Sequence, residues 1–177
     1  MNLRPIPALA AALSLVLAAG CNPTYNWRDY ASPDAPYKVM FPAKPATVTR
    51  SVYLDGLQVP MTMTAAEVEG VTFAGGTAEA PDPVRARASL DAMRLALARN
   101  VGVPAAKAPD AATVADAGGG RATAAIDAIG ARSGTPVRLV GRFEASGKRF
   151  YQVIVVGPAA AMPADQVDQF LTSFTAH

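Results

Sequence analysis

The chain has 177 residues, with 16 Lys or Arg against 14 Asp or Glu, a net charge of +2, one cysteine and one histidine. A charge this close to zero gives no support for binding nucleic acid or another strongly anionic partner. One cysteine excludes an intrachain disulfide, and a lone histidine, His177, gives no support for histidine-based catalysis or a metal site. The length predicts one domain with its own core.

The first 21 residues have the pattern of an export signal that ends at a cysteine. Arg4 supplies a positive charge, residues 6–19 are mostly apolar, and small residues at 18–20 precede Cys21. Together these features are typical of a secretory signal. The apolar run is shorter than the roughly 20 residues that a membrane-spanning helix needs.

This run resembles the lipobox of bacterial lipoproteins, although Ala18 stands where that family more often has Leu. The resemblance implies that residues 1–20 are removed and that Cys21 then carries a diacylglycerol on its sulfur and an amide-linked acyl chain such as palmitate. Several chains anchor firmly, because each buried CH₂ contributes about 0.8 kcal/mol. Asn22 is not the aspartate of inner-membrane retention, which favours the outer membrane facing the periplasm. The alternative is ordinary secretion with a free Cys21.

Residues 21–36 are expected to form a lipidated tether, and residues 37–177 a single domain. The tether mixes aromatic residues with Pro and Asp, a composition typical of irregular chain. Trp27 and Tyr30 could bind a ligand or sit among lipid headgroups. We expect them instead to fasten this segment onto the domain.

The clearest strand signals lie between residues 37 and 77. Tyr37–Phe41 is a short predicted strand, and Asp55-Gly56 predicts the two-residue turn of a hairpin, because both central residues of a type I′ turn need positive φ. The apolar pairs of this hairpin are Leu54 with Leu57, Val52 with Val59 and Val48 with Met63; the polar pairs are Tyr53 with Gln58, Ser51 with Pro60 and Thr49 with Thr62. This division predicts one buried face and one wet face. Pro60 predicts a sheet edge, since proline cannot donate to a ladder. Glu69-Gly70 predicts a second turn, followed by a strand over 71–77.

A helix is predicted to begin after Asp82 as its N-cap, with Pro83 at the first position, and to end at Gly102. Its apolar stripe consists of Leu90, Met93, Leu97 and Val101. Its charged residues, which fall mostly away from the stripe, are Arg85, Arg87, Asp91, Arg94 and Arg99. An anion-binding face is conceivable there, but the spacing of Asp91 from Arg87 and Arg94 favours a solvated face with paired charges.

The last third predicts a strand over 121–131, a turn at Ser133-Gly134, a hairpin over 136–156 and a final helix over 163–174. We place the hairpin turn at Ser146-Gly147, because that register joins opposite charges and aromatic residues. Its pairs are then Phe143 with Phe150, Leu139 with Ile154 and Val137 with Val156 on one face, and Glu144 with Arg149 and Arg142 with Tyr151 on the other. The second face also carries Val140, Val153 and Val155, so either a helix of this chain or a partner should cover part of it. The helix should turn Val167, Phe170, Leu171 and Phe174 inward.

The order of these elements predicts an α+β fold in which an antiparallel meandering sheet packs with two main helices. Three stretches carry a resemblance, namely Phe41–Pro45, Arg149–Gly157 and Phe170–Phe174. They resemble PsbP-like domains and related exported α+β domains of bacteria. The resemblance implies an antiparallel sheet between helices and a non-catalytic assembly or accessory role.

The sequence thus favours a lipid-anchored, non-catalytic envelope domain that binds or helps to assemble an envelope protein, with no cofactor, metal or nucleic acid. The candidate partner surface is the mixed sheet face, unless a helix covers it: Arg138, Val140, Arg142, Tyr151 and Val153. One alternative is a small hydrolase that uses carboxylates, which would need a pocket holding two acids of raised pKa. Another is a carrier of a hydrophobic ligand, which would need an apolar cavity between sheet and helices.

Overall fold

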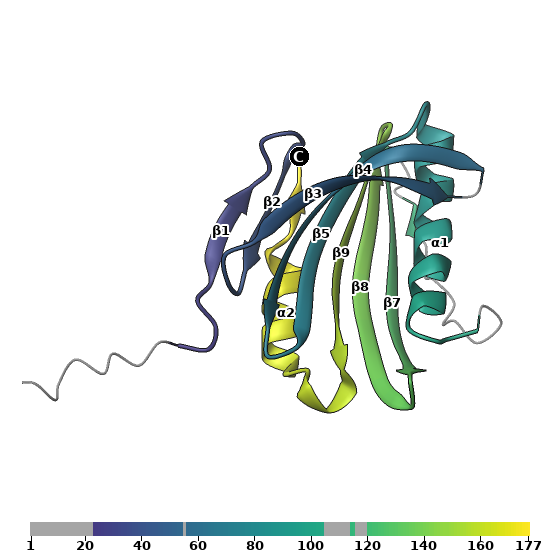
Figure 1. Ribbon diagram of the computed structural model, residues 1–177. Helices are drawn as coiled ribbons and strands as arrows, with labels where there is room; N and C mark the ends of the chain where they lie inside the picture. The colour runs from purple at the N-terminus through teal and green to yellow at the C-terminus, as the bar shows by residue number, and fades with distance from the viewer. Residues whose placement is uncertain (1–22, 55, 105–113, 116–119) are drawn as a thin grey trace, which may run out of the picture.

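The computed structural model describes residues 23–54, 56–104, 114–115 and 120–177. The fold is α+β: a curved seven-stranded sheet has helix α1 against one face, and helix α2 with a small three-stranded sheet against the other (Figure 1). Every strand pair is antiparallel within the described part of the chain. Cys21 and the predicted signal lie outside the described residues.

The large sheet has the strand order β3-β4-β5-β9-β8-β7-β6. Its strands are β3 (Ala46–Leu54), β4 (Leu57–Val68), β5 (Val71–Glu79), β6 (Val114–Ala115), β7 (Arg121–Arg132), β8 (Thr135–Ser146) and β9 (Arg149–Pro158). The small sheet, in the order β1-β2-β10, consists of β1 (Arg28–Ala31), β2 (Tyr37–Phe41) and β10 (Thr175–Ala176). The helices are α1 (Pro83–Asn100), the short 3₁₀ helix η2 (Ala159–Ala161) and α2 (Ala164–Ser173). The expected meander is therefore present twice, in β3-β4-β5 and in β7-β8-β9, and the two meanders meet where β5 pairs with β9.

The first hairpin has the predicted register, from Leu54 opposite Leu57 to Val48 opposite Met63. The predicted edge at Pro60 is also present, because β5 pairs with β4 only from Thr62 onward. The tip of the β3–β4 hairpin therefore extends past the rest of the sheet.

The prediction of one buried and one wet face is wrong for this hairpin. Val59 and Met61 are buried on the α1 side of β4, whereas Thr64 and Ala66 are buried on the opposite side. Val48, expected on the buried face, is 47% exposed. One end of β4 packs in the cluster that contains α1, whereas at the other end Thr64 donates a hydrogen bond to Tyr30 of the small sheet, so burial changes sides along the strand.

Helix α1 begins and ends as its capping residues predict. An oxygen of Asp82 accepts a hydrogen bond from the backbone N–H of Arg85 at 2.8 Å, and Gly102 follows the helix with a φ of +83°. Leu90 and Met93 of the predicted stripe are buried against the sheet. Arg94 differs from the expectation of a solvated face, because it is only 7% exposed, although its Nε donates to Asp91 at 3.2 Å as the spacing predicted.

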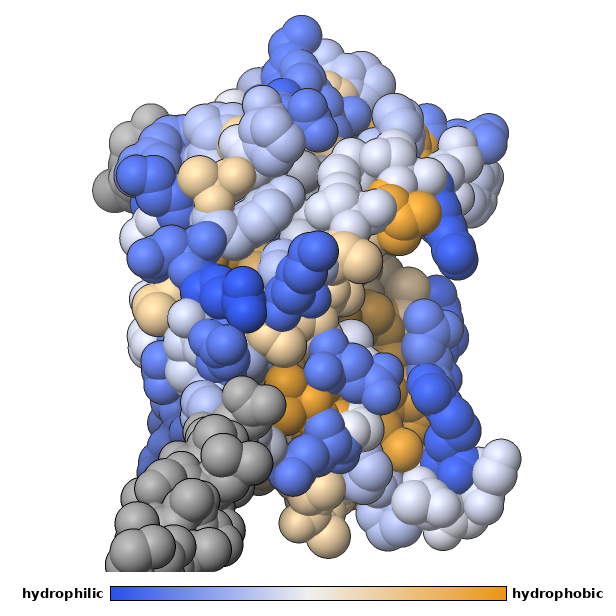
Figure 2. Space-filling model, turned by 60° about the vertical axis from the view of Figure 1, so that its left-hand side comes forward, coloured by the Kyte–Doolittle hydropathy of each residue, from blue (hydrophilic) through white to orange (hydrophobic). Residues whose placement is uncertain are grey.

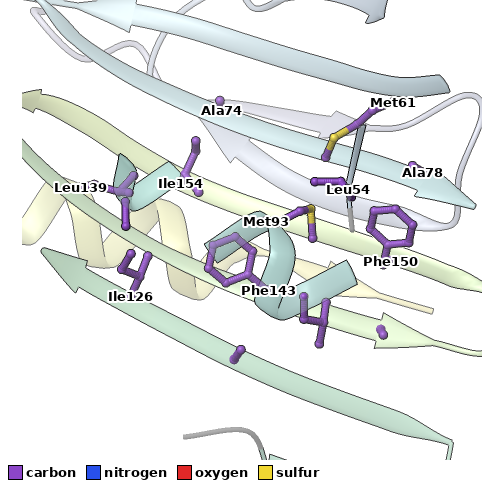
Figure 3. Packing of buried hydrophobic residues seen from close by; sticks show 14 of the residues in the cluster. Leu54, Met61, Ala74, Ala78, Met93, Ile126, Leu139, Phe143, Phe150 and Ile154 are labelled. Atoms are coloured by element: carbon purple, nitrogen blue, oxygen red, sulfur yellow. The ribbon is translucent and has the colours of Figure 1, made fainter. Parts of the chain in front are cut away.

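The core under α1 is built from the inward side chains of both meanders. In Figure 3, Met93 of α1 lies between Phe143 of β8 and Phe150 of β9. Gly130 of β7 lets the end of the helix come close, since a Cβ there would be 1.8 Å from the carbonyl oxygen of Val101. This contact sets the position of the end of α1 on the sheet.

The register predicted for the second hairpin is wrong by two residues. Its turn is Gly147-Lys148, so that Ser146 lies opposite Arg149 and Glu144 opposite Tyr151. Gly147 has a φ of +57°, and a two-residue turn with glycine first is the type II′ arrangement. A shift of two residues leaves every side chain on its predicted face, which is why the apolar pattern alone could not reveal it.

The other face of the sheet is covered by α2 and the small sheet. Phe170 of α2 is fully buried, with its ring centre 5.4 Å from those of both Phe41 and Phe73. All four residues predicted to face inward from this helix are buried. The N-terminal segment is part of the same packing: Trp27 donates its indole N–H to Gln166 of α2 at 3.0 Å, as the fastening interpretation predicted.

Candidate functional site

Part of the predicted partner surface lies inside the molecule. Tyr151 and Val153 are 2% and 1% exposed under α2, and Val140 packs against the same cluster. Arg142 donates to the carbonyl oxygen of Leu171 in α2 at 3.1 Å. The mixed face is thus covered by a helix of this chain, and its apolar residues belong to the core.

Arg138, the fifth residue of that predicted surface, has a partner on the neighbouring strand. Its guanidinium donates two hydrogen bonds to Asp127 of β7, at 2.9 and 2.7 Å. These hydrogen bonds and the charge of Arg138 outweigh burial, which acts in the opposite direction, and so lower the pKa of Asp127 below its ordinary value. Because Arg138 is paired with Asp127 inside this protein, its charge does not require another protein as a partner.

A row of polar side chains crosses the α2 face near one end of the sheet. Thr123, Glu144, Tyr151 and Thr77 are directly opposite one another along β7, β8, β9 and β5, and opposed residues share a face. Glu144 is 7% exposed and Thr77 is 4% exposed. The sequence does not reveal this polar row, because the row depends on both the true register of the second hairpin and the pairing of β5 with β9.

Two groups of the polar row titrate away from their ordinary ranges. Burial raises the pKa of Glu144, an effect that the positive charges of Arg121 and Arg142 only partly offset. The Nε of Arg121 lies 3.2 Å from a carboxylate oxygen of Glu144. Burial likewise raises the pKa of Tyr151.

Next to the polar row is a surface pocket of about 300 Å³, which we call the C-terminal pocket. It is lined by Pro36, Glu79, Ser146, Lys148, Arg149, Tyr151 and His177. The backbone N–H of His177 donates to the carbonyl oxygen of Pro36 at 2.9 Å, which holds the end of the chain at the pocket. His177, which had no candidate helper in the sequence, therefore lines the same pocket as Tyr151 and Lys148.

The two acids at this pocket differ in their surroundings. Glu79 lines it and is held by Arg149 through a hydrogen bond of 2.9 Å, whereas Glu144 is next to it in the polar row. A carboxylate hydrolase would need a pocket that holds two acids of raised pKa; burial raises the pKa of Glu144, but Glu144 does not line this pocket. No three His, Cys, Asp or Glu side chains of the described residues gather as a metal site requires.

A second surface feature is the groove between the β3–β4 hairpin and α1. Its volume is about 330 Å³. It is lined by Tyr53, Leu54, Ala88, Asp91, Ala92, Leu95, Ala96 and Arg99. Ala88, Ala92 and Ala96 recur every four residues and form a shallow floor on α1, while the side chain of Tyr53 is 74% exposed.

Strand β3 also forms one edge of the large sheet. Its nine residues pair with β4 alone, so one side of its backbone has no neighbouring strand in the described structure. Most of its side chains are exposed, and Arg50 is the single charged residue in the strand. Edges of this length are usually protected by several charges, a proline or a covering segment.

The most exposed large hydrophobic residues lie on three different elements: Val48 and Tyr53 on β3, Val84 on α1 and Ile129 on β7. On the side of the molecule toward β1, apolar residues lie between hydrophilic ones (Figure 2). A hollow of about 530 Å³ is lined by residues of the small sheet and the end of α2, including the charged Asp29 and Lys38. It lies around the small sheet and not between the large sheet and the helices, where a hydrophobic carrier would need its cavity.

Comparison with known proteins leaves the family open. No family model matches the chain, and no curated protein matches it. A solved structure from Bacteroides thetaiotaomicron VPI-5482, determined at 1.50 Å, is similar over 85% of this chain with 11% sequence identity and a TM-score of 0.47. The alignment covers 48% of that chain, so this chain matches about half of its length. No helix among the described residues is long and apolar enough to cross a membrane.

Proposed function

We propose that this protein is a lipid-anchored, non-catalytic binding domain of the bacterial cell envelope, which takes up an extended segment of another envelope protein along β3. The anchoring rests on the apolar run, the small residues and Cys21 in the N-terminal sequence. The binding rests on one observation above the others, the nine-residue edge of β3 that pairs on one side only.

Strand addition suits this edge for three reasons. The free side of β3 offers backbone N–H and C=O groups in the spacing that another strand can pair with. Arg50 is the only charge that would oppose an incoming strand. At the far end of β3, Tyr53 and the alanine floor of α1 form the groove into which a side chain of the added segment can pack.

The anchor is tested by the variant Cys21→Ser. The wild-type protein should be recovered with the outer-membrane fraction, and its intact mass should exceed that of the chain from residue 21 by the mass of the attached lipid. The variant should leave the membrane fraction, because without acyl chains it loses about 0.8 kcal/mol for every buried CH₂. Equal membrane recovery of both proteins would refute lipid anchoring.

The strand edge is tested by a pair of matched lysine substitutions. Val48→Lys places a charge on the exposed edge, whereas Val84→Lys makes the same change at an exposed valine of α1. Chemical crosslinking in intact cells should join an envelope protein to the wild type and to Val84→Lys, with the crosslinked peptide mapping to one extended segment of that partner. Val48→Lys should lose this product. Equal crosslinking in both variants would show that β3 is not the binding site.

A further inference from the structure

We propose that the C-terminal pocket binds a small oxyanion, that is, a phosphate or carboxylate group carried by a small molecule. The pocket lies between the β8–β9 turn at Gly147-Lys148 and the end of β10, where Ala176 and His177 meet Pro36. None of its lining residues belongs to the β3 edge, so this inference stands independently of the proposed function.

The side chains that line the pocket or lie beside it carry one more positive charge than negative charge. Arg121, Lys148 and Arg149 supply three positive charges, against two negative charges from Glu79 and Glu144. Arg149 is paired with Glu79 and Arg121 with Glu144. Lys148 is exposed and forms no ion pair with any carboxylate in the described residues, so its charge is available to a ligand.

Tyr151 supplies a fixed hydrogen-bond donor. Its ring packs against those of Tyr37 and Phe174, with centres 5.9 and 5.8 Å away, and the residue is 98% buried while still lining the pocket. Within the described structure its hydroxyl has no hydrogen-bond partner. Because this hydroxyl is open to the pocket, a ligand or a water there can accept its hydrogen bond.

Neighbouring groups extend the same site. Thr77 lies directly opposite Tyr151 but does not line the pocket, and its buried hydroxyl has no hydrogen-bond partner among the described residues. Ser146 and His177 line the pocket and add a hydroxyl and an imidazole. At about 300 Å³ the pocket is at the small end of ligand sites. This combination suits a compact group with several acceptor oxygens and a negative charge.

The test is isothermal titration calorimetry on the protein purified from membranes in a non-ionic detergent. One arm uses inorganic phosphate and the other uses acetate, each against sodium chloride at matched ionic strength. Saturable binding in either arm is expected, and the arm with the lower Kd identifies the preferred oxyanion. Absence of saturable binding in both arms overturns the proposal.

Three variants assign any binding to this pocket. Tyr151→Phe keeps the packed ring but removes one hydrogen bond, and it should raise Kd roughly fivefold, since such a bond contributes about 1 kcal/mol. Lys148→Ala should raise Kd about tenfold, and because Lys148 is exposed this variant tests the site even if Tyr151→Phe folds poorly. Lys44→Ala, at another exposed lysine, should leave Kd unchanged. Binding that all three variants retain overturns the assignment to the C-terminal pocket.

Discussion

Glu144 is a carboxyl group whose burial outweighs the attraction of its neighbouring arginines. Because its pKa is raised in the folded protein, the protonated form is relatively favoured there, so its contribution to stability is greatest below the pKa of the unfolded chain. That contribution is lost as the pH rises through the folded pKa. Glu144→Gln should remove this loss: it should unfold less readily than the wild type at neutral pH, and the difference should shrink as the pH falls below the ordinary range of glutamate.

Urea unfolding of both proteins at a series of pH values measures this difference. A wild type that gains stability relative to Glu144→Gln as the pH rises would mean that the ion pair with Arg121 outweighs burial, contrary to this account.

Gly130 is a position where the fold leaves no room for a side chain. Gly130→Ala would place its Cβ 1.8 Å from the carbonyl oxygen of Val101, so either β7 or the end of α1 must move. We expect a loss of about 2–3 kcal/mol in the free energy of unfolding, the upper range for overpacking. Gly120→Ala is the matched control, because nothing lies within 4 Å of a Cβ there, and it should change stability by less than about 0.5 kcal/mol. Equal effects in the two variants would contradict the close approach of α1 to β7.

At the scale of elements, α2 covers part of the mixed sheet face, for which the sequence allowed either a helix of this chain or a partner. Phe170→Ala removes a fully buried ring that contacts Phe41 of β2 and Phe73 of β5, and it should lower the free energy of unfolding by about 3–5 kcal/mol. Asp168→Ala, on the exposed side of the same helix, should have an effect below about 0.5 kcal/mol. Thermal or urea unfolding separates the two outcomes. If Phe170→Ala were no more damaging than its control, α2 would not be the cover of this sheet face.

The elements also show what a sequence can and cannot predict. The register of the β3–β4 hairpin, the caps of α1 and the inward face of α2 depend on neighbouring residues, and all three were predicted correctly. The second hairpin has glycine next to two candidate turn partners, Ser146 and Lys148, and both registers keep the same faces.

The pairing of β5 with β9 joins residues far apart along the chain, such as Thr72 with Val156, and leaves no local signal. The same is true of β10 beside β2. The polar row from Thr123 to Thr77 depends on the pairing of β5 with β9 and on the register of the β8–β9 hairpin. The C-terminal pocket depends on the pairing of β10 with β2, because that pairing brings His177 to Pro36. Neither could therefore be predicted.

At the scale of the whole molecule, both sheet faces are largely occupied by the protein's own elements, and the edge of β3, which pairs with no second described strand anywhere along its length, is open to a partner. Anchoring at Cys21 would hold this edge near the membrane, where an envelope protein could reach it. The central claim is therefore that the anchored domain captures an envelope protein through β3.

The most direct measurement places a photo-crosslinking amino acid at position 53 on β3 or, as a control, at position 129 on β7, where the native side chains are 74% and 64% exposed. In intact cells, position 53 should give one discrete product, whose partner peptide comes from a single extended segment. This product should be lost when Val48→Lys or Cys21→Ser is added, and position 129 should give no such product. Equal capture from both positions, or a product from position 53 that survives Val48→Lys, would contradict the account.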